Sequence, residues 1–314
     1  MAAVAAVVPQ TVLTIDPRHR IVEGVASDGS TIWVSSILDR QILACAKVCR
    51  TIAILPEPLH PFALAWDWGR KILWVAADCP PGVSVIRACD RGALIGLSPS
   101  GAIRYRFAPK DIAFHPGDVS ASQSAILVSD SQNGLVWGLL SGRRAGLTAI
   151  NRPGDGKSAQ GTALMPSGTE VIVADYSRGI GRIDLKTTAT TWLPRQDGKP
   201  LRGVDGLIRC GSVYFGIYNG STPGALVAIT PSPTGITIEL PLGRDALPDP
   251  TQVAYDGKRL LLVADSGWAT IDRPGFVRTR GTPILAVPVS KDCKPQSARV
   301  IYKRGGVAAA KSLP

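Results

Sequence analysis

The sequence predicts an all-β protein, a six-bladed β-propeller with four antiparallel strands in each blade. Three observations lead to this prediction. Gly (33) and Pro (25) are abundant among the 314 residues, which is typical of a chain with many turns. Short runs of β-branched and aromatic residues alternate with these turns. One such run recurs six times at a spacing of roughly 40–50 residues, the repeat length of a propeller blade.

The recurring run ends at Ser, Asp or Gly and is predicted as the second strand of each blade. Its six copies are residues 31–36, 71–78, 125–131, 170–177, 212–220 and 259–267. A shorter run with small residues precedes each copy and is predicted as the innermost strand, where only small side chains fit near the axis. These runs are residues 24–27, 63–66, 118–121, 161–164, 206–208 and 252–255.

Two further runs follow and complete each blade as its third and fourth strands. They are residues 41–46 and 51–55, 84–89 and 102–107, 135–140 and 147–150, 179–185 and 190–193, 225–229 and 235–240, and 284–289 and 298–302. One strand-like run, 11–16, is left over. We expect it to close the last blade beside 298–302. The whole chain, 1–314, is then one domain with flexible tails at 1–10 and 305–314.

Composition narrows the choice of partners. The formal net charge is +11, but no run of five basic residues occurs, and the Lys and Arg residues are spread along the chain. Nucleic-acid modules gather such residues on one face, so we expect no nucleic-acid partner. No stretch of 18 apolar residues is present, so no membrane-spanning helix is expected. The expected partner is a small-molecule substrate, with an anionic one favoured by the positive charge. The chain is expected to be a monomer or a homodimer.

The N-terminal residues and the cysteine positions bear on the compartment and on the cysteine state. Residues 1–10 are small and apolar but lack a basic segment, so they fit the stub of a signal peptide or a cytoplasmic start. We expect a periplasmic or secreted protein, with the cytoplasm as the alternative. Cys45 and Cys49 flank a predicted hairpin turn and would face each other closely enough for a disulfide. For most of the six cysteines we expect buried free thiols.

In a propeller, the residues at the start of the six innermost strands surround one end of the central channel. We call this end the mouth. By alignment of the repeats, the mouth residues are Glu23, Phe62, Gly117, Gln160, Asp205 and Thr251, with Asp118 beside Gly117. Carboxylates aimed at one axis repel each other in a partly dry cavity. A divalent cation would relieve that repulsion, and an all-oxygen set of Glu, Asp and Gln suits Ca²⁺, Mg²⁺ or Mn²⁺. The alternative is a hydrated or salt-bridged channel, with Arg202 or Arg20 as counter-ion.

The loops between the second and third strands also lie at the mouth. Asn219 belongs to one of them, and the longest, 265–283, carries Trp268. We interpret this long loop as a lid that supplies an aromatic wall and positive charge. The arginines assigned to mouth loops predict a positive rim over an acidic floor. They are Arg20, Arg178, Arg202, Arg273, Arg278 and Arg280.

Two further sets of residues belong to the same end. Asp78, Asp130, Asp175 and Asp265 recur at the end of the second strand, which predicts turn caps rather than catalytic groups. The histidines His19, His60 and His115 each precede an innermost strand. His115, beside Asp118, is the best candidate for a general acid or base, although a histidine in a surface turn is the alternative.

The ordered motifs resemble a known family. Glu23–Gly24, His115–Pro116–Gly117–Asp118, Gln160–Gly161, Val204–Asp205–Gly206–Leu207 and Asp265–Ser266–Gly267–Trp268 are similar to motifs of the SMP-30/gluconolactonase/LRE-like superfamily of six-bladed propellers. Many members are metal-dependent lactonases or esterases. The resemblance implies a metal held by Glu23, by Gln160 at the place of the family's usual Asn, and by Asp205.

The leading functional hypothesis is therefore a hydrolase of a lactone or related ester, with Ca²⁺ as the first choice of metal. Asp205 or His115 would activate water, and Glu23 is the further catalytic candidate. The predicted substrate-binding residues are Asp118, Phe62, Asn219, Trp268, Arg178, Arg202 and Thr251. Two alternatives remain: a non-catalytic ligand-binding propeller, or a metal-free enzyme that resembles strictosidine synthase and uses Glu23 as acid and base.

Overall fold

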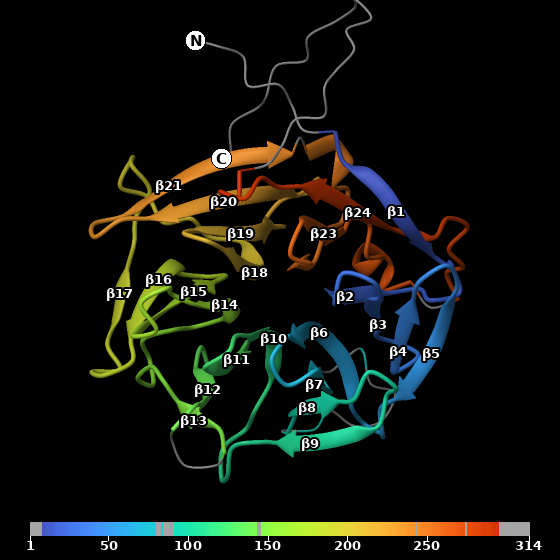
Figure 1. Ribbon diagram of the computed structural model, residues 1–314, viewed down its shortest axis with the longest axis horizontal. Coiled ribbons are helices and arrows are strands. Elements are labelled where there is room, and N and C mark those ends of the chain that lie inside the picture. The colour runs from blue at the N-terminus through green and yellow to red at the C-terminus, as the bar shows by residue number, and fades with distance from the viewer. Residues whose placement is uncertain are drawn as a thin grey trace, which may run out of the picture.

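The computed structural model describes residues 8–79, 83, 89, 91–142, 146–242, 244–273 and 275–294. These residues form six four-stranded antiparallel sheets arranged around a central axis (Figure 1). In the described part of the chain the only helical elements are two short 3₁₀ helices, η1 (Arg244–Ala246) and η2 (Trp268–Thr270). The predicted six-bladed propeller is confirmed. No described helix has the length and apolar character to cross a membrane.

The first three blades follow the predicted order. Blade one contains β2 (Val22–Ser27), β3 (Ile32–Ser36), β4 (Gln41–Cys45) and β5 (Cys49–Ile54). Blade two contains β6 (His60–Asp67), β7 (Ile72–Asp78), β8 (Ala93–Leu97) and β9 (Ile103–Phe107). Blade three contains β10 (Pro116–Ala121), β11 (Ala125–Asp130), β12 (Val136–Leu140) and β13 (Thr148–Ala149). In each blade the first strand lies nearest the axis (Figure 1).

The next blades repeat this pattern. Blade four contains β14 (Ala159–Leu164), β15 (Glu170–Asp175), β16 (Gly179–Asp184) and β17 (Thr190–Trp192). Blade five contains β18 (Val204–Cys210), β19 (Val213–Tyr218), β20 (Ala225–Pro231) and β21 (Ile236–Leu242). Blade six contains β22 (Val253–Tyr255), β23 (Arg259–Val263), β24 (Thr282–Pro288) and, as its outer strand, β1 (Gln10–Ile15).

As expected, the N-terminal strand closes the last blade, but the strand it pairs with differs from the expectation. We expected strand 11–16 to lie beside a strand at 298–302, but β1 pairs directly with β24, with Ile15 opposite Thr282 (Figure 1). The N-terminal strand is therefore the fourth strand of blade six, and 298–302 lies outside the described residues. Segments from the two ends of the propeller thus meet in one sheet, so hydrogen bonds between strands hold the ring shut.

The third strand of blade two was also predicted in the wrong place. We expected it at 84–89, but the strand that pairs with β7 is β8, Ala93–Leu97. All five residues of β8 are buried, because this strand lies inside the sheet between β7 and β9. The run 84–88 lies outside the described residues.

The core consists of the apolar layers between neighbouring blades. Trp33 of blade one and Trp66 of blade two, for example, stack with ring centroids 4.7 Å apart. The innermost strands come so close that glycine is required at some positions. A Cβ on Gly24 would lie 2.4 Å from the carbonyl oxygen of Phe62, and one on Gly161 would lie 2.3 Å from Leu207 Cβ. These close approaches explain the small residues of the innermost strands.

The expectation that most of the six cysteines are buried free thiols is wrong, because all six are paired. The three disulfides are Cys45–Cys49, Cys79–Cys89 and Cys210–Cys293. Of these, the bond from Cys45 to Cys49 is the hairpin pair expected from the sequence, and its two residues lie opposite each other on β4 and β5. Cys210–Cys293 joins blade five to the segment after β24, a link between distant parts of the chain that no local spacing reveals.

Candidate functional site

A cavity of about 390 Å³ lies at the mouth of the channel. It takes residues from all six blades and from the loop after β23. The lining residues are Glu23, Phe62, Asp78, Pro116, Gly117, Ser131, Gln132, Gln160, Tyr176, Asp205, Asn219, Asp249, Thr251 and Trp268. All six mouth residues predicted from the repeat are among them. The structure therefore brings the predicted carboxylates and amides together in one space.

A repeated β-bulge directs the mouth residues into this cavity. In blades one to five, the pairing of the innermost strand with the second strand shifts register at the same place, for example between Val22 and Val25 and between Val204 and Leu207. Glu23 and Asp205 lie within two of these bulges. Since a bulge bends the strand and re-aims its side chains, it turns a residue that would face a neighbouring blade toward the axis.

Glu23 is held at the junction of blades one and six. The indole Nε1 of Trp268 donates a hydrogen bond to its Oε2. The hydroxyl of Thr251 donates a hydrogen bond to its carbonyl oxygen at 2.8 Å. Burial raises the pKa of the Glu23 carboxyl well above its usual value, and the charge of Asp205 raises it further, against the lowering effect of the Trp268 hydrogen bond. Glu23 therefore retains a proton more readily than an exposed glutamate.

Asp205 is half-buried at the same cavity and accepts hydrogen bonds from two donors of its own. Asn219 Nδ2 donates to its Oδ2 at 2.9 Å, and the backbone N–H of Gly206 donates to its Oδ1 at 3.0 Å. Burial raises the pKa of Asp205, although these two hydrogen bonds lower it. Tyr176 lies close enough for burial and the Asp205 charge to raise the pKa of its phenol.

Two amide side chains complete the polar lining. Asn219 Oδ1 is buried and has no hydrogen-bond partner among the described residues, so it is a free acceptor at the cavity. Gln160 lies against Gly117, where an added Cβ would come within 2.7 Å of the Gln160 Oε1. The described residues contain no group of three or more His, Cys, Asp and Glu side chains arranged to hold a metal ion. Any cation here would therefore need amide oxygens beside Glu23 and Asp205.

Asp118, expected to contact substrate, does not line the cavity. Its side chain is only 3% exposed and accepts a hydrogen bond from Gln252 Nε2 at 2.8 Å. Burial, followed by the charge of Asp205, raises its pKa to about 7. Asp118 therefore lies among the innermost strands, out of reach of a ligand in the cavity.

His115 is likewise set back from the cavity. Its Nδ1 lies 3.3 Å from both carboxylate oxygens of Asp78, and Asp78, rather than His115, lines the cavity. The prediction that Asp78 caps a turn is therefore incomplete, because its carboxylate binds a histidine. Asp130 and Asp175 do cap turns, since each accepts backbone N–H groups from the residues that follow.

The segment after β23 forms one wall of the cavity, as the lid interpretation expects. Trp268 stacks against Phe62, with ring centroids 6.2 Å apart. Asp249 anchors this segment by accepting hydrogen bonds from Ser266 Oγ at 2.8 Å and Gly267 N at 3.0 Å. Arg20 donates to the carbonyl oxygens of residues 270 and 271. The wall is thus fastened to the propeller.

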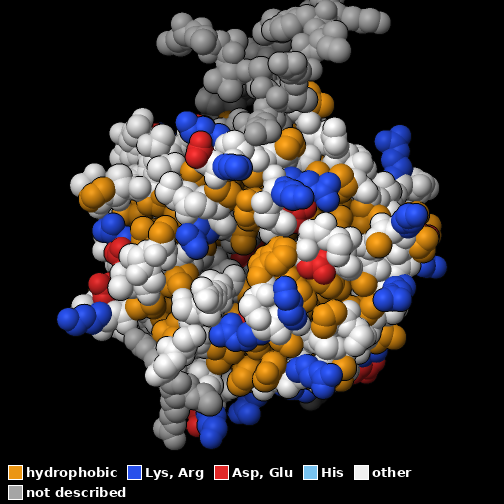
Figure 2. Space-filling model, viewed as in Figure 1, with side chains coloured by type: hydrophobic (Ala, Val, Ile, Leu, Met, Phe, Trp, Pro, Cys, Tyr) orange, Lys and Arg blue, Asp and Glu red, His pale blue; other side chains and the backbone are white. Residues whose placement is uncertain are grey.

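The expected positive rim is not part of the cavity, whose lining includes no Lys or Arg among the described residues. Arg178 lies over the ring of Trp192 on the outer strand of blade four, at 5.9 Å. Arg202 is exposed. Arg278 is buried and paired with Asp265 at 2.7 Å. Asp265, predicted to cap a turn, therefore holds the loop through Arg278 instead, and the following N–H groups of Ser266 and Gly267 donate to Asp249. On the face shown in Figure 2, Lys and Arg side chains are scattered rather than gathered.

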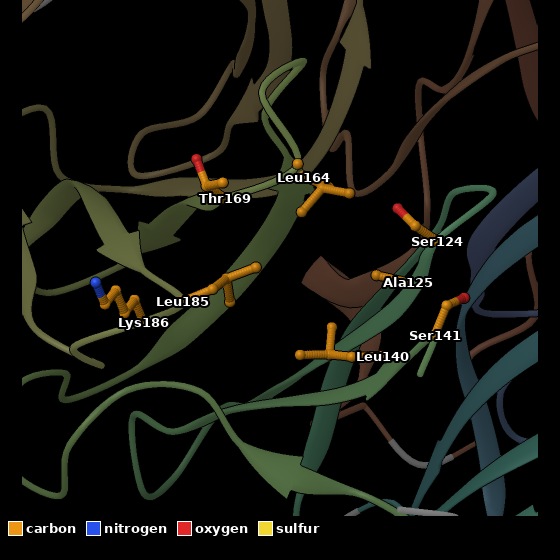
Figure 3. Close-up of a pocket in the computed structure, with 9 residues that line it drawn as sticks. Ser124, Ala125, Leu140, Ser141, Leu164, Thr169, Leu185 and Lys186 are labelled. Atoms are coloured by element: carbon orange, nitrogen blue, oxygen red, sulfur yellow. The ribbon is translucent and has the colours of Figure 1, made fainter. Parts of the chain in front are cut away.

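A second cavity, of about 350 Å³, lies between blades three and four at the end of the propeller opposite the mouth. Figure 3 shows Leu140, Leu164 and Leu185 around it, with Ser124, Thr169 and Lys186 at its edge. Its lining contains no carboxylate, histidine or cysteine among the described residues. It therefore lacks the acid and base groups that the axial cavity has.

Sequence reasoning missed Tyr176, Asp249 and Gln252. A usable signal existed for Tyr176. Ser131, Tyr176 and Asn219 each directly follow the last residue of a second strand, and all three line the cavity. Asp249 and Gln252 belong to blade six, where β22 is short and the repeat is least regular.

No protein-family model matches this chain, and no curated protein sequence matches it. Solved structures show a shared fold. A gluconolactonase from Xanthomonas campestris has a TM-score of 0.57 at 15% identity, covering 92% of this chain and 97% of that one. The PQQ-bound aldose sugar dehydrogenase from Streptomyces coelicolor has a TM-score of 0.58 at 11% identity, covering 89% and 98%.

A catalytically inactive variant of virginiamycin B lyase from Staphylococcus aureus, solved with quinupristin, has a TM-score of 0.56 at 13% identity, covering 85% of this chain and 80% of that one. These three proteins are named for three different activities. At such low identity the likeness establishes the propeller fold alone.

Proposed function

We propose that this protein is a hydrolase that opens a lactone or a related ester in the axial cavity. The observation that carries the proposal is the convergence of two half-buried carboxylates, Glu23 and Asp205, in one cavity from blades that are distant in the chain, each with its pKa raised by burial. Packing does not require such a pair, and keeping both ionised in a dry site is costly. Strongly perturbed carboxyl groups in a cleft mark functional sites.

We further propose that the pair holds a divalent cation, with Ca²⁺ preferred. The donors would be Glu23, Asp205, Gln160 and the unpartnered Oδ1 of Asn219. All are oxygen atoms, which suits Ca²⁺, with Mg²⁺ and Mn²⁺ as alternatives. When bound, such an ion supplies Lewis-acid polarisation of a carbonyl group.

The chain's own residues supply the proton chemistry. Asp205 would accept a proton from a water molecule as that water attacks the carbonyl carbon of the substrate. The bond between the carbonyl carbon and the ring oxygen then breaks, and the departing oxygen takes the proton from Asp205. The product is a hydroxy acid. Phe62 and Trp268, which stack on each other, would form one aromatic wall beside the substrate ring, and His115 would orient Asp78 at the edge of the cavity.

The gluconolactonase among the similar structures is consistent with this proposal but carries little weight at 15% identity. Two alternatives stay open as outcomes of the test: a non-catalytic ligand-binding propeller, and a metal-free enzyme that uses Glu23 as acid and base. We also propose an oxidising compartment, periplasmic or extracellular, because all six cysteines are paired in disulfides, as is common outside the cytoplasm.

The test combines metal binding with turnover. Crystals soaked in Ca²⁺ or Mn²⁺ should show the ion between Glu23 and Asp205, and a panel of lactones and esters should yield at least one substrate whose hydrolysis stops with a chelator. Hydrolysis that is unaffected by the chelator would support the metal-free enzyme. Absence of hydrolysis across the panel, with a ligand bound in the cavity, would support the binding propeller.

A further inference from the structure

The two proposed catalytic carboxylates lie close to a buried hydrogen-bond network on the axis. Gln252 Oε1 accepts from the backbone N–H of Val25 at 2.7 Å and of Leu64 at 3.2 Å. Its Nε2 donates to Asp118 Oδ1 at 2.8 Å and lies 3.4 Å from the Leu64 carbonyl oxygen. Asp118 Oδ2 accepts from the backbone N–H of Leu207 at 3.4 Å. Five of the six blades thus meet through two side chains.

Two of the backbone N–H groups in this network belong to residues close to the two carboxylates in the chain. Val25 is two residues after Glu23, and Leu207 is two residues after Asp205. Each is also the residue at which strand pairing resumes after the bulge that carries the carboxylate. Pulling Val25 or Leu207 along the axis would therefore move Glu23 or Asp205.

We propose that Asp118 and Gln252 are positioning residues that set the separation of Glu23 and Asp205. This inference rests on the proposed function only in that it assigns those two carboxylates to the reaction. Neither Asp118 nor Gln252 lines the cavity, so each acts through the backbone that it holds. Neighbouring sheets are otherwise joined mainly by apolar packing, which is less directional than hydrogen bonds.

The pattern of donors and acceptors makes the pair specific. Gln252 presents its oxygen to two N–H groups and its nitrogen to Asp118. With asparagine at position 118, either the amide nitrogen faces Gln252 Nε2 or it faces the N–H of Leu207, so one donor always meets another. With glutamate at position 252, two carboxylates meet and must share a proton, which is harder at high pH.

Exchanging the two groups should restore the network. In the double variant Asp118→Asn with Gln252→Glu, the new carboxylate would accept hydrogen bonds from Val25, Leu64 and the amide of the introduced asparagine. The oxygen of that asparagine would accept from Leu207. Of the original hydrogen bonds, the double variant would lack only the one at 3.4 Å to the Leu64 carbonyl oxygen. A double-mutant cycle therefore tests the pairing directly.

The experiment measures the melting temperature and two NMR signals at pH 8. The indole N–H signal of Trp268, assigned with Trp268→Phe, reports its hydrogen bond to Glu23. The side-chain amide signals of Asn219 report its bond to Asp205. Each single variant should lower the melting temperature by about 2–8 °C and shift both NMR signals. The double variant should return both signals toward their wild-type positions.

Ser120→Ala is the matched control, because it removes another buried interaction between innermost strands, the 3.2 Å pair of Ser120 Oγ and Thr162 Oγ1. It should lower stability without moving either signal. Single variants that lower stability but leave both signals in place would overturn the proposal, as would a double variant no better than the singles. The signals need no substrate or metal, so they decide positioning even if no lactone or ester is hydrolysed.

Discussion

Trp268 and Glu23 are 245 residues apart in the chain and joined by a hydrogen bond from the indole nitrogen to the carboxylate. This bond crosses from the segment after β23 in blade six to β2 in blade one, next to the place where the ring closes. The segment that forms one wall of the cavity is therefore joined directly to the Glu23 carboxylate, which also lines the cavity.

Trp268→Phe should change the pH dependence of activity. The substitution keeps an aromatic ring beside Phe62 but removes the hydrogen bond that lowers the pKa of Glu23. That pKa should rise, so the acidic limb of the pH–rate profile, where Glu23 becomes ionised, should move to higher pH. Profiles of the wild type and the variant check this. A superimposable acidic limb would show that the indole bond does not control Glu23.

Asp118 should make stability depend on pH. Its pKa is raised to about 7 in the folded protein from 3.8, so the folded state binds the extra proton and stability falls as pH rises from about 4 to 7. The loss is on the order of 2–4 kcal/mol. Asp118→Asn cannot titrate there, so the wild type should lose stability relative to this variant between pH 5 and pH 8. Denaturant unfolding at both pH values measures the difference.

The comparison uses the difference in unfolding free energy between the two proteins. Glu23 and Asp205 also have raised pKa values, so they too make stability fall as the pH rises. Part of the gap comes through Glu23, because the charge of Asp118 also raises the pKa of Glu23, and this part has the same sign. A stability gap that stays constant from pH 5 to pH 8 would mean that Asp118 does not titrate in this range.

Gly117→Ala should disturb Gln160. The added Cβ would lie 2.7 Å from the Gln160 Oε1, which is too close, so the amide must move. We expect Ca²⁺ affinity, measured by calorimetry, to fall by about 10–100-fold, as for other changes that disturb ligand orientation. Combining it with Gln160→Asn, whose side chain is one methylene shorter, should recover part of the affinity. Unchanged affinity in Gly117→Ala would remove Gln160 from the proposed ligand set.

The disulfide Cys210–Cys293 should stabilise the closed ring. It spans 83 residues, whereas Cys45–Cys49 spans 4. In the chain-entropy description, a longer loop restricts the unfolded chain more. Replacing both Cys210 and Cys293 by serine should therefore cost about 2–3 kcal/mol more than the same change at Cys45 and Cys49. Equal losses in thermal unfolding would contradict this explanation.

The sequence predicts the fold well because the repeat carries the information. The same repeat places Glu23, Gln160 and Asp205 at equivalent positions, and the structure finds all three at one cavity. Two of the failures are local, the third strand of blade two and the Cys79–Cys89 disulfide, and the others were set by interactions between distant segments. Three contacts join distant parts of the chain: the pairing of β1 with β24, the disulfide between Cys210 and Cys293, and the hydrogen bond between Asp118 and Gln252.

The arginines illustrate the same limit. Assigning Arg178 to a mouth loop was not enough to predict where its long side chain points, and it lies over Trp192 rather than over the cavity. The direction of this side chain is set by packing against another strand of the same blade, which alignment of the repeats does not show.

The central claim, that Asp205 is the base of a hydrolytic site, is tested most directly by the turnover number of Asp205→Asn on the best lactone or ester substrate. Asp130→Asn, which alters a buried turn-capping carboxylate outside the cavity, is the matched control. We expect Asp205→Asn to stay folded and to lose about 10²–10⁴ in rate, while Asp130→Asn keeps most of its activity. Wild-type turnover in Asp205→Asn would contradict the account.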